Sequence, residues 1–265
     1  VSVNSQSNTA CFGESTAVLA GNIRTCYLLL HRVVAPSTAM AAADKKVLLI
    51  DSDPQGNAST GLGILEENRS PSLYDLLTIG QQKKESIKKT IIPNLDIITA
   101  TQDLAASEIE LAVVERRENR LKEILKQITN YDYFFIDCPP ALGLLTINGL
   151  VAADSVIIPL QCEFFALEGL SALTKTIKSI KKNFNKDLEI EGVVLTMHDK
   201  RNSLSGLVEN DVRSFFGKKV YNTMIPRNIR ISEAPSHGEP VLIYDTSCVG
   251  STAYIELAKE VILNQ

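Results

Sequence analysis

The sequence lacks the cysteine pattern of a disulfide framework or a zinc site. Its five cysteines, at positions 11, 26, 138, 162 and 248, lie far apart and form no CxxC pair and no Cys/His cluster. Disulfide-rich secreted domains and zinc modules depend on closely spaced ligands. We therefore expect reduced thiols and a cytoplasmic protein.

A long apolar run is also missing. The first forty residues contain two short apolar pieces, TAVLAG and CYLLL, which Arg24 separates and no basic stretch precedes. A membrane span needs about 20 predominantly apolar residues, and a signal peptide needs a basic start. We expect neither, and a soluble protein with no membrane partner.

The chain has no excess of positive charge. Its net charge of −4 argues against a protein that coats nucleic acid with its whole surface. Residues 175–230 nevertheless hold twelve Lys and Arg against six Asp and Glu, a local +6 that leaves −10 for the rest. This segment could meet a polyanion. On charge alone, however, we favour a solvated helix face for the series Lys175, Lys178, Lys181 and Lys182.

What the sequence does contain is a regular alternation of apolar runs and helical patterns. At 265 residues and 45% apolar content, the chain can bury the core of one large α/β domain. The alternation predicts a doubly wound, mostly parallel sheet with helices on both faces. Strands are expected at 47–50, 95–99, 133–137, 155–160, 190–197 and 220–226, helices at 107–128 and 167–184, and a surface helix or loop at 81–89.

Aspartates stand where two of these strands end, at the edge where parallel sheets bind ligands. Asp51 and Asp53 follow the first strand, and Asp137 ends the third strand. One such aspartate alone is more often a helix or turn cap. Two strand ends of this kind in one α/β chain favour the Mg²⁺ site of a nucleotide hydrolase.

A third strand end carries basic residues. Pro226, Arg227 and Asn228 follow the expected strand at 220–226, and Arg230 comes two residues later. A turn accounts for the proline and the asparagine but not for the basic pair.

Several stretches together resemble one protein family. VLLIDSDPQGNASTGLGI, YDYFFIDCPPALGLLTINGL, GVVLTMHDKR and IPRNIRISEAPSHGEPVLIYD are similar to the ParA/Soj-type chromosome and plasmid partitioning ATPases, relatives of the MinD-like deviant Walker proteins. The likeness runs from about Ser37 to the C-terminus. It implies a P-loop NTPase fold, ATP and Mg²⁺, an ATP-dependent homodimer, non-specific DNA binding at the nucleoid and a ParB-type centromere-binding partner.

The resemblance also implies roles for eight residues. It places Asp53 in hydrolysis, Asp51 and Asp137 near the metal, Pro226, Arg227 and Asn228 against the adenine, and Arg201 and Arg230 on DNA. The local +6 supports the last pair, because phosphate neutralisation needs clustered Lys and Arg. Such contacts would read no base sequence.

The glycine- and lysine-rich phosphate loop of that family is missing. No GxxxxGK[ST] occurs in the chain, the first lysine is Lys45, and RTCYLLLHRVVAP stands where the loop is expected. We therefore divide the chain into a divergent segment, 1–36, and a ParA-like nucleotide-binding domain, 37–265. Because natural divergence erodes a buried strand and loop gradually, the abrupt change near Ser37 favours a misread, frameshifted or decayed N-terminal segment over a true loss of ATP binding.

Three functions follow as hypotheses. The first is an ATP-hydrolysing DNA-segregation protein, impaired in the chain as written. The second, of a different class, is a non-catalytic ParA-like module that binds DNA or a partner. The third is a MinD-like membrane-cycling ATPase, but the C-terminal STAYIELAKEVILNQ has no basic amphipathic extension for membrane docking.

Overall fold

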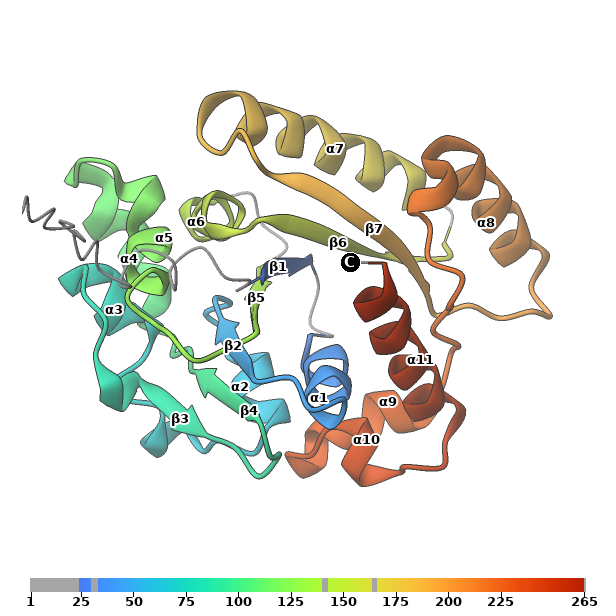
Figure 1. Ribbon diagram of the computed structural model, residues 1–265, viewed down its shortest axis with the longest axis horizontal. Helices are drawn as coiled ribbons and strands as arrows, with labels where there is room; N and C mark the ends of the chain where they lie inside the picture. Colours follow the sequence, from blue (N-terminus) through green and yellow to red (C-terminus); the bar gives the residue numbers. More distant parts are fainter. Residues whose placement is uncertain (1–23, 30–32, 140–142, 164–165, 265) are drawn as a thin grey trace, which may run out of the picture.

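A seven-stranded sheet forms the centre of the computed structural model, which describes residues 24–29, 33–139, 143–163 and 166–264 (Figure 1). The strand order is β3-β4-β2-β5-β1-β6-β7. Every neighbouring pair is parallel except β3 and β4. The predicted doubly wound, mostly parallel α/β fold is therefore confirmed.

Strands and helices largely alternate along the chain, except that β3 and β4 are consecutive and α8 to α11 all follow β7. The strands are β1 (Arg24–Leu29), β2 (Val47–Asp51), β3 (Ile87–Lys89), β4 (Leu95–Ile98), β5 (Tyr133–Cys138), β6 (Ser155–Gln161) and β7 (Glu189–Thr196). The α-helices are α1 (Val34–Ala42), α2 (Asn57–Gly61), α3 (Leu73–Ile79), α4 (Leu104–Glu110), α5 (Arg120–Leu125), α6 (Leu144–Ala152), α7 (Ala166–Asn183), α8 (Ser203–Phe216), α9 (Ile229–Glu233), α10 (Val241–Tyr244) and α11 (Val249–Leu263).

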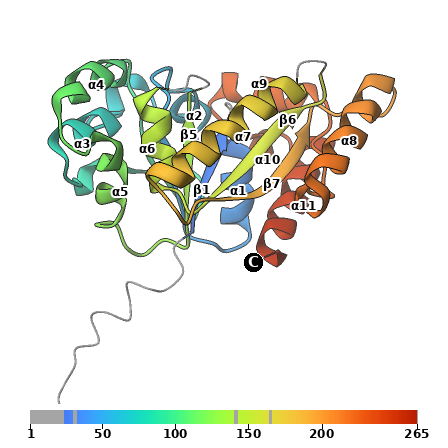
Figure 2. The ribbon, with the colours of Figure 1, turned by 90° about the horizontal axis from the view of Figure 1, so that it is seen from above.

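The central strands are buried on both faces: β2, β4 and β5 are buried at every position, and most of their residues are apolar. Side chains alternate between faces along a strand, so Leu48 and Ile50 of β2 join one core while Val47 and Leu49 join the other. Helices α3 to α8 cover the first face, and α1, α2, α10 and α11 cover the second. Figure 1 shows α6 and α7 on one side of the strands and α1 and α11 on the other, and Figure 2 shows α3 to α5 at one end of the sheet and α8 at the other.

The expected strand at 220–226 is wrong. This segment forms only isolated bridges, Val193 with Val220 and His198 with Pro226. The Glu260 carboxylate of α11 accepts the N–H groups of Asn222 and Thr223, at 2.7 and 2.9 Å. A side chain therefore takes two donors that a strand would give to a neighbouring strand. The other five predicted strands are confirmed, with bounds that differ by one or two residues.

The single long helix expected at 107–128 is also wrong. Helix α4 ends at Glu110, a 3-10 turn covers Leu111–Val113, and a second one, Arg117–Asn119, precedes α5. Arg116 between them has φ of +55°, a left-handed conformation that no α-helix contains. The Lys-rich helix at 167–184 is confirmed as α7, whereas 81–89 forms a 3-10 turn followed by edge strand β3.

Strand β1 was not expected from the sequence. Arg24–Leu29 lies between β5 and β6, and it is parallel to both. The rest of the divergent segment before it, residues 1–23, lies outside the described residues. In the part of the chain that the structure describes, no helix is long and apolar enough to cross a bilayer.

Candidate functional site

Two aspartates face each other across neighbouring strands at the carboxyl edge of the sheet. Asp51 ends β2 and pairs in register with Asp137 of β5. Asp53 follows two residues after Asp51, and the three residues are 0, 0 and 2% exposed for Asp51, Asp137 and Asp53. The structure thus brings together the three carboxylates that the sequence singled out, and it removes all of them from bulk water.

Asp51 is held by the start of α2. The Ser59 hydroxyl and the Ser59 N–H both donate to Asp51 Oδ2, at 2.7 and 2.8 Å. The Asp53 N–H donates to Asp51 Oδ1 at 3.3 Å. Burial raises the pKa of Asp51 to about 6, although the hydrogen bonds from Ser59 and Asp53 work in the opposite direction.

Asp137 has no comparable support among the described residues. Neither of its carboxylate oxygens has a hydrogen-bond partner there. Burial, and then the charges of Asp51 and Asp53, raise the pKa of Asp137 well above its usual value. A buried carboxylate left in this state costs free energy unless a ligand compensates it.

These carboxylates fit a magnesium ion that keeps most of its water. Mg²⁺ prefers oxygen ligands and is commonly bound through one or two carboxylates together with waters and phosphate oxygens. Among the described residues, no group of three or more His, Cys, Asp and Glu side chains could hold a metal by itself. The site therefore fits Mg²⁺ brought with a phosphate ligand, not a closed metal site made of protein groups.

A buried arginine supports the loop that carries Asp53. Arg69 is 8% exposed, and its guanidinium donates to Thr60 Oγ1 at 2.8 Å and to the Ile64 and Ala100 carbonyls at 3.1 and 3.4 Å. Gly56 lies against it with φ of +62°, and a Cβ there would come within 2.3 Å of Arg69 Nη1. A glycine is required at this position both for its backbone conformation and for the close approach of Arg69.

The phosphate side of this edge is chemically incomplete. The connection from β1 to α1, where a phosphate loop would lie, includes residues 30–32, which are outside the described residues. Its sequence, LHRVV, contains no glycine and no lysine. The residues present at this edge fit the metal but do not fit a family-type cradle for the β- and γ-phosphates.

A pocket of about 890 Å³ opens between the end of β7, the 224–229 segment and α11. The expected adenine residues line it together with Arg201, and the segment from Met197 to Arg201 forms the opposite wall. The His198 N–H donates to the Ile225 carbonyl, and the Arg227 N–H donates to the His198 carbonyl, both at 3.1 Å. The complete lining is Met197, His198, Asp199, Lys200, Arg201, Met224, Pro226, Arg227, Asn228, Ile229, Ser232, Val249, Thr252 and Ala253.

Arg201 is exposed but paired. Its side chain is 90% exposed, and its guanidinium donates through Nε and Nη2 to the two Asp199 oxygens, at 3.1 and 3.0 Å. The hydrogen bonds from Arg201 lower the pKa of Asp199 to about 2.

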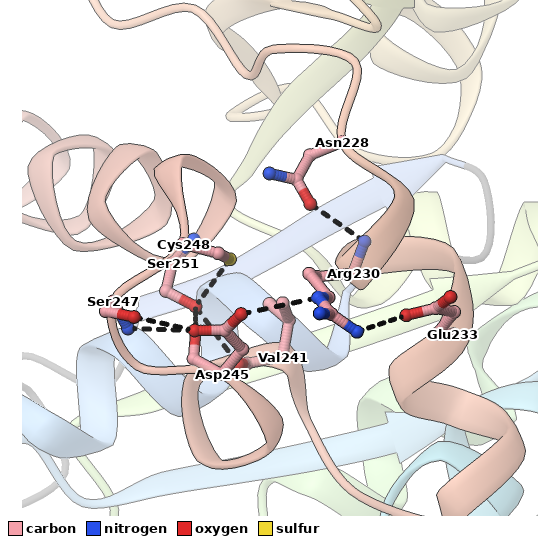
Figure 3. Close-up of polar contacts among 8 residues, drawn as sticks. All are labelled: Asn228, Arg230, Glu233, Val241, Asp245, Ser247, Cys248 and Ser251. Carbon is pink, nitrogen blue, oxygen red and sulfur yellow. Dashed lines mark hydrogen bonds and ion pairs between the residues drawn. The ribbon is translucent and has the colours of Figure 1, made fainter.

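Arg230 belongs to α9 and does not line this pocket. Its side chain is 49% exposed, with Nη1 2.9 Å from Glu233 Oε2 and Nε 3.4 Å from Asp245 Oδ2. Figure 3 shows Arg230 between these two carboxylates, with the Asn228 side chain capping the first turn of α9 through the Arg230 N–H. Both expected DNA contacts thus already have acidic partners.

Comparison with known proteins decides the family. A model described as an AAA domain matches residues 32–190. The chain is 55% identical over 228 residues to the chromosome partitioning protein ParA of Caulobacter vibrioides, covering 85% of each protein. It is 52% identical over 226 residues to the sporulation initiation inhibitor protein Soj of Bacillus subtilis, covering 85% of this chain and 89% of that protein. The chain belongs to the ParA/Soj family of partitioning ATPases.

Solved structures agree on the fold of this ParA/Soj chain. Cobyrinic acid a,c-diamide synthase from Mycobacterium smegmatis with bound ADP and magnesium has a TM-score of 0.77 and 30% identity, covering 89% of this chain and 93% of that one. The cell division ATPase MinD of Pyrococcus furiosus has a TM-score of 0.75 and 21% identity, covering 91 and 99%. The predicted P-loop NTPase-like architecture is confirmed.

Sequence reasoning missed the residues that hold the ParA/Soj-type motifs in place. Ser59 donates to Asp51, Arg69 donates to Thr60 of α2, and Glu260 accepts from the 222–223 segment. The sequence offered no spacing signal for Glu260, which lies 37 residues from Thr223. Ser59 lies inside the stretch that carries the family resemblance, so its position could have been singled out. Its bond to Asp51 could not be seen in the sequence.

Proposed function

We propose that this chain is organised to bind Mg²⁺ and ATP at the carboxyl edge of the sheet and to act in DNA segregation. The observation that carries the proposal is the opposed pair of buried aspartates, Asp51 and Asp137, one of which lacks hydrogen-bond partners among the described residues. Asp51 accepts hydrogen bonds from Ser59 and Asp53, but burial of Asp137 beside it costs free energy that no contact among the described residues offsets. A bound cation with its water ligands would compensate the negative charge of the two aspartates.

In this proposal each strand-end aspartate has its own task. Asp51 and Asp137 would hold Mg²⁺ through its waters, and the bound ion would neutralise charge on the phosphates. Asp53, two residues after Asp51 and 2% exposed, would position the attacking water. Residues 37–265 would form the nucleotide-binding domain.

The base would occupy the pocket lined by Pro226, Arg227 and Asn228. Its volume of about 890 Å³ falls within the range of ordinary small-molecule sites. Cobyrinic acid a,c-diamide synthase of Mycobacterium smegmatis, 30% identical, was crystallised with ADP and magnesium, which supports a nucleotide and Mg²⁺ as the ligands.

The remaining parts of the proposal follow from the family. ATP would bring two copies together, and Arg201 and Arg230 of the dimer would contact DNA phosphates without reading bases. A ParB-type protein would be the partner, and the nucleoid in the cytoplasm would be the place of action.

A second candidate is a ParA-like module that binds DNA or a partner without turnover. The observation in its favour is the absence of any GxxxxGK[ST] from the sequence. Without the lysine and the glycine backbone, the phosphates lose their main donors.

Equilibrium binding of a fluorescent ADP analogue, with and without Mg²⁺, tests the proposal and separates the two candidates. Mg²⁺-dependent binding that Asp137→Asn weakens supports a nucleotide site. DNA binding with no nucleotide binding at millimolar concentrations supports the second candidate. Failure to bind both nucleotide and DNA contradicts the two together.

A further inference from the structure

The wall of the base pocket is tied to helix α8 through one carboxylate. His198, which is 9% exposed, stands at the end of β7 and lines the pocket. Its Nε2 lies 3.3 Å from Glu209 Oε2 on α8. The backbone of His198 makes the two hydrogen bonds to Ile225 and Arg227 that join the opposite walls of the pocket. Glu209 therefore reaches the joint between the walls through His198.

The second oxygen of Glu209 reaches the other end of the same segment. Glu209 Oε1 accepts a hydrogen bond from Arg213 Nε at 2.9 Å, and Arg213 Nη2 donates to the Tyr221 carbonyl at 3.3 Å. Tyr221 begins the irregular segment that leads to Pro226. One carboxylate thus connects α8 to both ends of residues 221–227.

The electrostatics agree with a charged Glu209 at this position. The hydrogen bond from Arg213 lowers the pKa of Glu209 against the effect of its burial. Burial raises the pKa of the nearby Cys162 thiol to about 11, and the charge of Glu209 acts in the same direction. A charged, partly buried carboxylate makes stronger hydrogen bonds than a neutral group would.

We propose that Glu209 is a positioning residue for the base pocket, acting through His198 and Arg213 to hold residues 221–227 against the end of β7. The segment is not a strand, and it meets the sheet through two isolated bridges and a hydrogen bond from the Ile225 N–H to the Leu195 carbonyl, so side chains of α8 have room to fix its position. This inference rests on the proposed function for its link to a nucleotide. The contacts of Glu209 with His198 and Arg213, which we call the clamp, do not depend on that function.

Hydrogen exchange measured by mass spectrometry on the full chain tests the clamp directly. Glu209→Ala should speed exchange in peptides covering 197–201 and 221–228, and exchange in β2 and β4 should stay unchanged. Glu209→Gln, which keeps an acceptor oxygen, should give a smaller change. Glu256→Ala, which removes an exposed i,i+3 partner of Lys259 on α11, is the matched control and should change neither peptide. Unchanged exchange at 221–228 in Glu209→Ala would overturn the inference.

Binding of methylanthraniloyl-ADP and methylanthraniloyl-GDP tests the link to the base. Glu209→Ala should weaken the ADP analogue about tenfold, as loss of a charge-assisted hydrogen bond predicts, and lower its preference over the GDP analogue. Glu209→Gln should restore part of both. A loss of affinity with an unchanged preference would make Glu209 merely structural and overturn the positioning role. If the wild-type chain binds neither analogue, the proposed function fails, and the exchange experiment still decides whether the clamp exists.

Discussion

The acidic strand ends and the two exposed arginines differ in burial and in whether an opposite charge lies nearby. Asp137 is fully buried, and neither of its carboxylate oxygens has a hydrogen-bond partner among the described residues. Arg201 and Arg230 are 90 and 49% exposed at their side chains, and each has a carboxylate within 3.0 Å. At the acidic edge, a buried carboxyl group has no hydrogen-bond partner among the described residues. The two arginines, by contrast, are exposed to water and paired with carboxylates.

The difference separates two kinds of evidence for function. An uncompensated buried charge destabilises the fold, so a ligand is the natural reason to keep it. Exposed ion pairs contribute at most about 1 kcal/mol and occur on most protein surfaces. The geometry of the acidic edge therefore supports a ligand site by itself. A DNA-binding role for the arginines rests on the family resemblance and on the local positive charge.

The largest effect concerns turnover and would show whether the acidic edge is a complete half-site. The chain as written should hydrolyse ATP at least about 10²-fold more slowly than its relatives, since loss of even one donor to a developing charge costs that much. With a KGGxGKT-type loop placed ahead of Ser37, Mg²⁺-dependent hydrolysis should appear in a phosphate-release assay. In that protein Asp53→Ala should abolish hydrolysis and leave ATP-driven dimerisation largely in place. Ordinary turnover by the unaltered chain would refute this prediction.

The next effect concerns stability at the acidic edge. Asp137→Asn should stabilise the metal-free protein by about 1–2 kcal/mol at pH 8, because it removes a buried charge beside two other carboxylates. Mg²⁺ with ADP should raise the Tm of the wild type and not that of the variant. Thermal unfolding with and without both ligands measures each difference. A destabilised variant would mean that Asp137 already has a partner in the fold.

A smaller effect on stability is expected at Glu260, whose two carboxylate oxygens both accept hydrogen bonds. Burial acts to raise its pKa, but the hydrogen bonds from Asn222 and Thr223 keep it below the usual value. A lowered acid pKa adds stability above the unfolded pKa of about 4.3, and that stability is lost as pH falls through the folded pKa. Glu260→Gln should therefore cost about 1 kcal/mol at pH 7, and this cost should shrink as the pH falls below the unfolded pKa and disappear below the folded pKa. Denaturant unfolding at several pH values checks this, with Glu256→Gln as the control.

The smallest effect on stability is expected for the two arginines, whose proposed role is to bind DNA. Arg201→Ala and Arg230→Ala should each change stability by less than about 0.5 kcal/mol. In the loop-restored dimer each should weaken binding to unrelated DNA sequences equally and lower the salt slope by roughly one unit per lost phosphate contact. Asp199→Asn should strengthen DNA binding, since it releases Arg201. Unchanged slopes in both arginine variants would reduce them to ordinary surface charge.

The sequence by itself determined the fold class, the positions of five strands along the chain and the aspartates at two strand ends. Continuous apolar runs such as 47–50 and 133–137, which alternate with helical patterns, predict buried strands of a parallel sheet, and the last residues of such strands lie at one edge. For this reason Asp51 and Asp137 were expected at the same edge of the sheet, whereas their pairing in register on neighbouring strands is known only from the structure. The missing lysine loop is likewise a property of the sequence alone.

The tertiary structure decided how the motifs are held and which charges are free. Period and composition do not show that Arg116 breaks a helix, that 24–29 enters the middle of the sheet, or that Glu260 replaces a strand partner for 222–223. Each depends on residues distant in sequence competing for the same backbone donors and the same buried space. The pairing of Arg201 with Asp199 and the reach of Glu209 to both ends of 221–227 are side-chain choices of the same kind, and only packing fixes them.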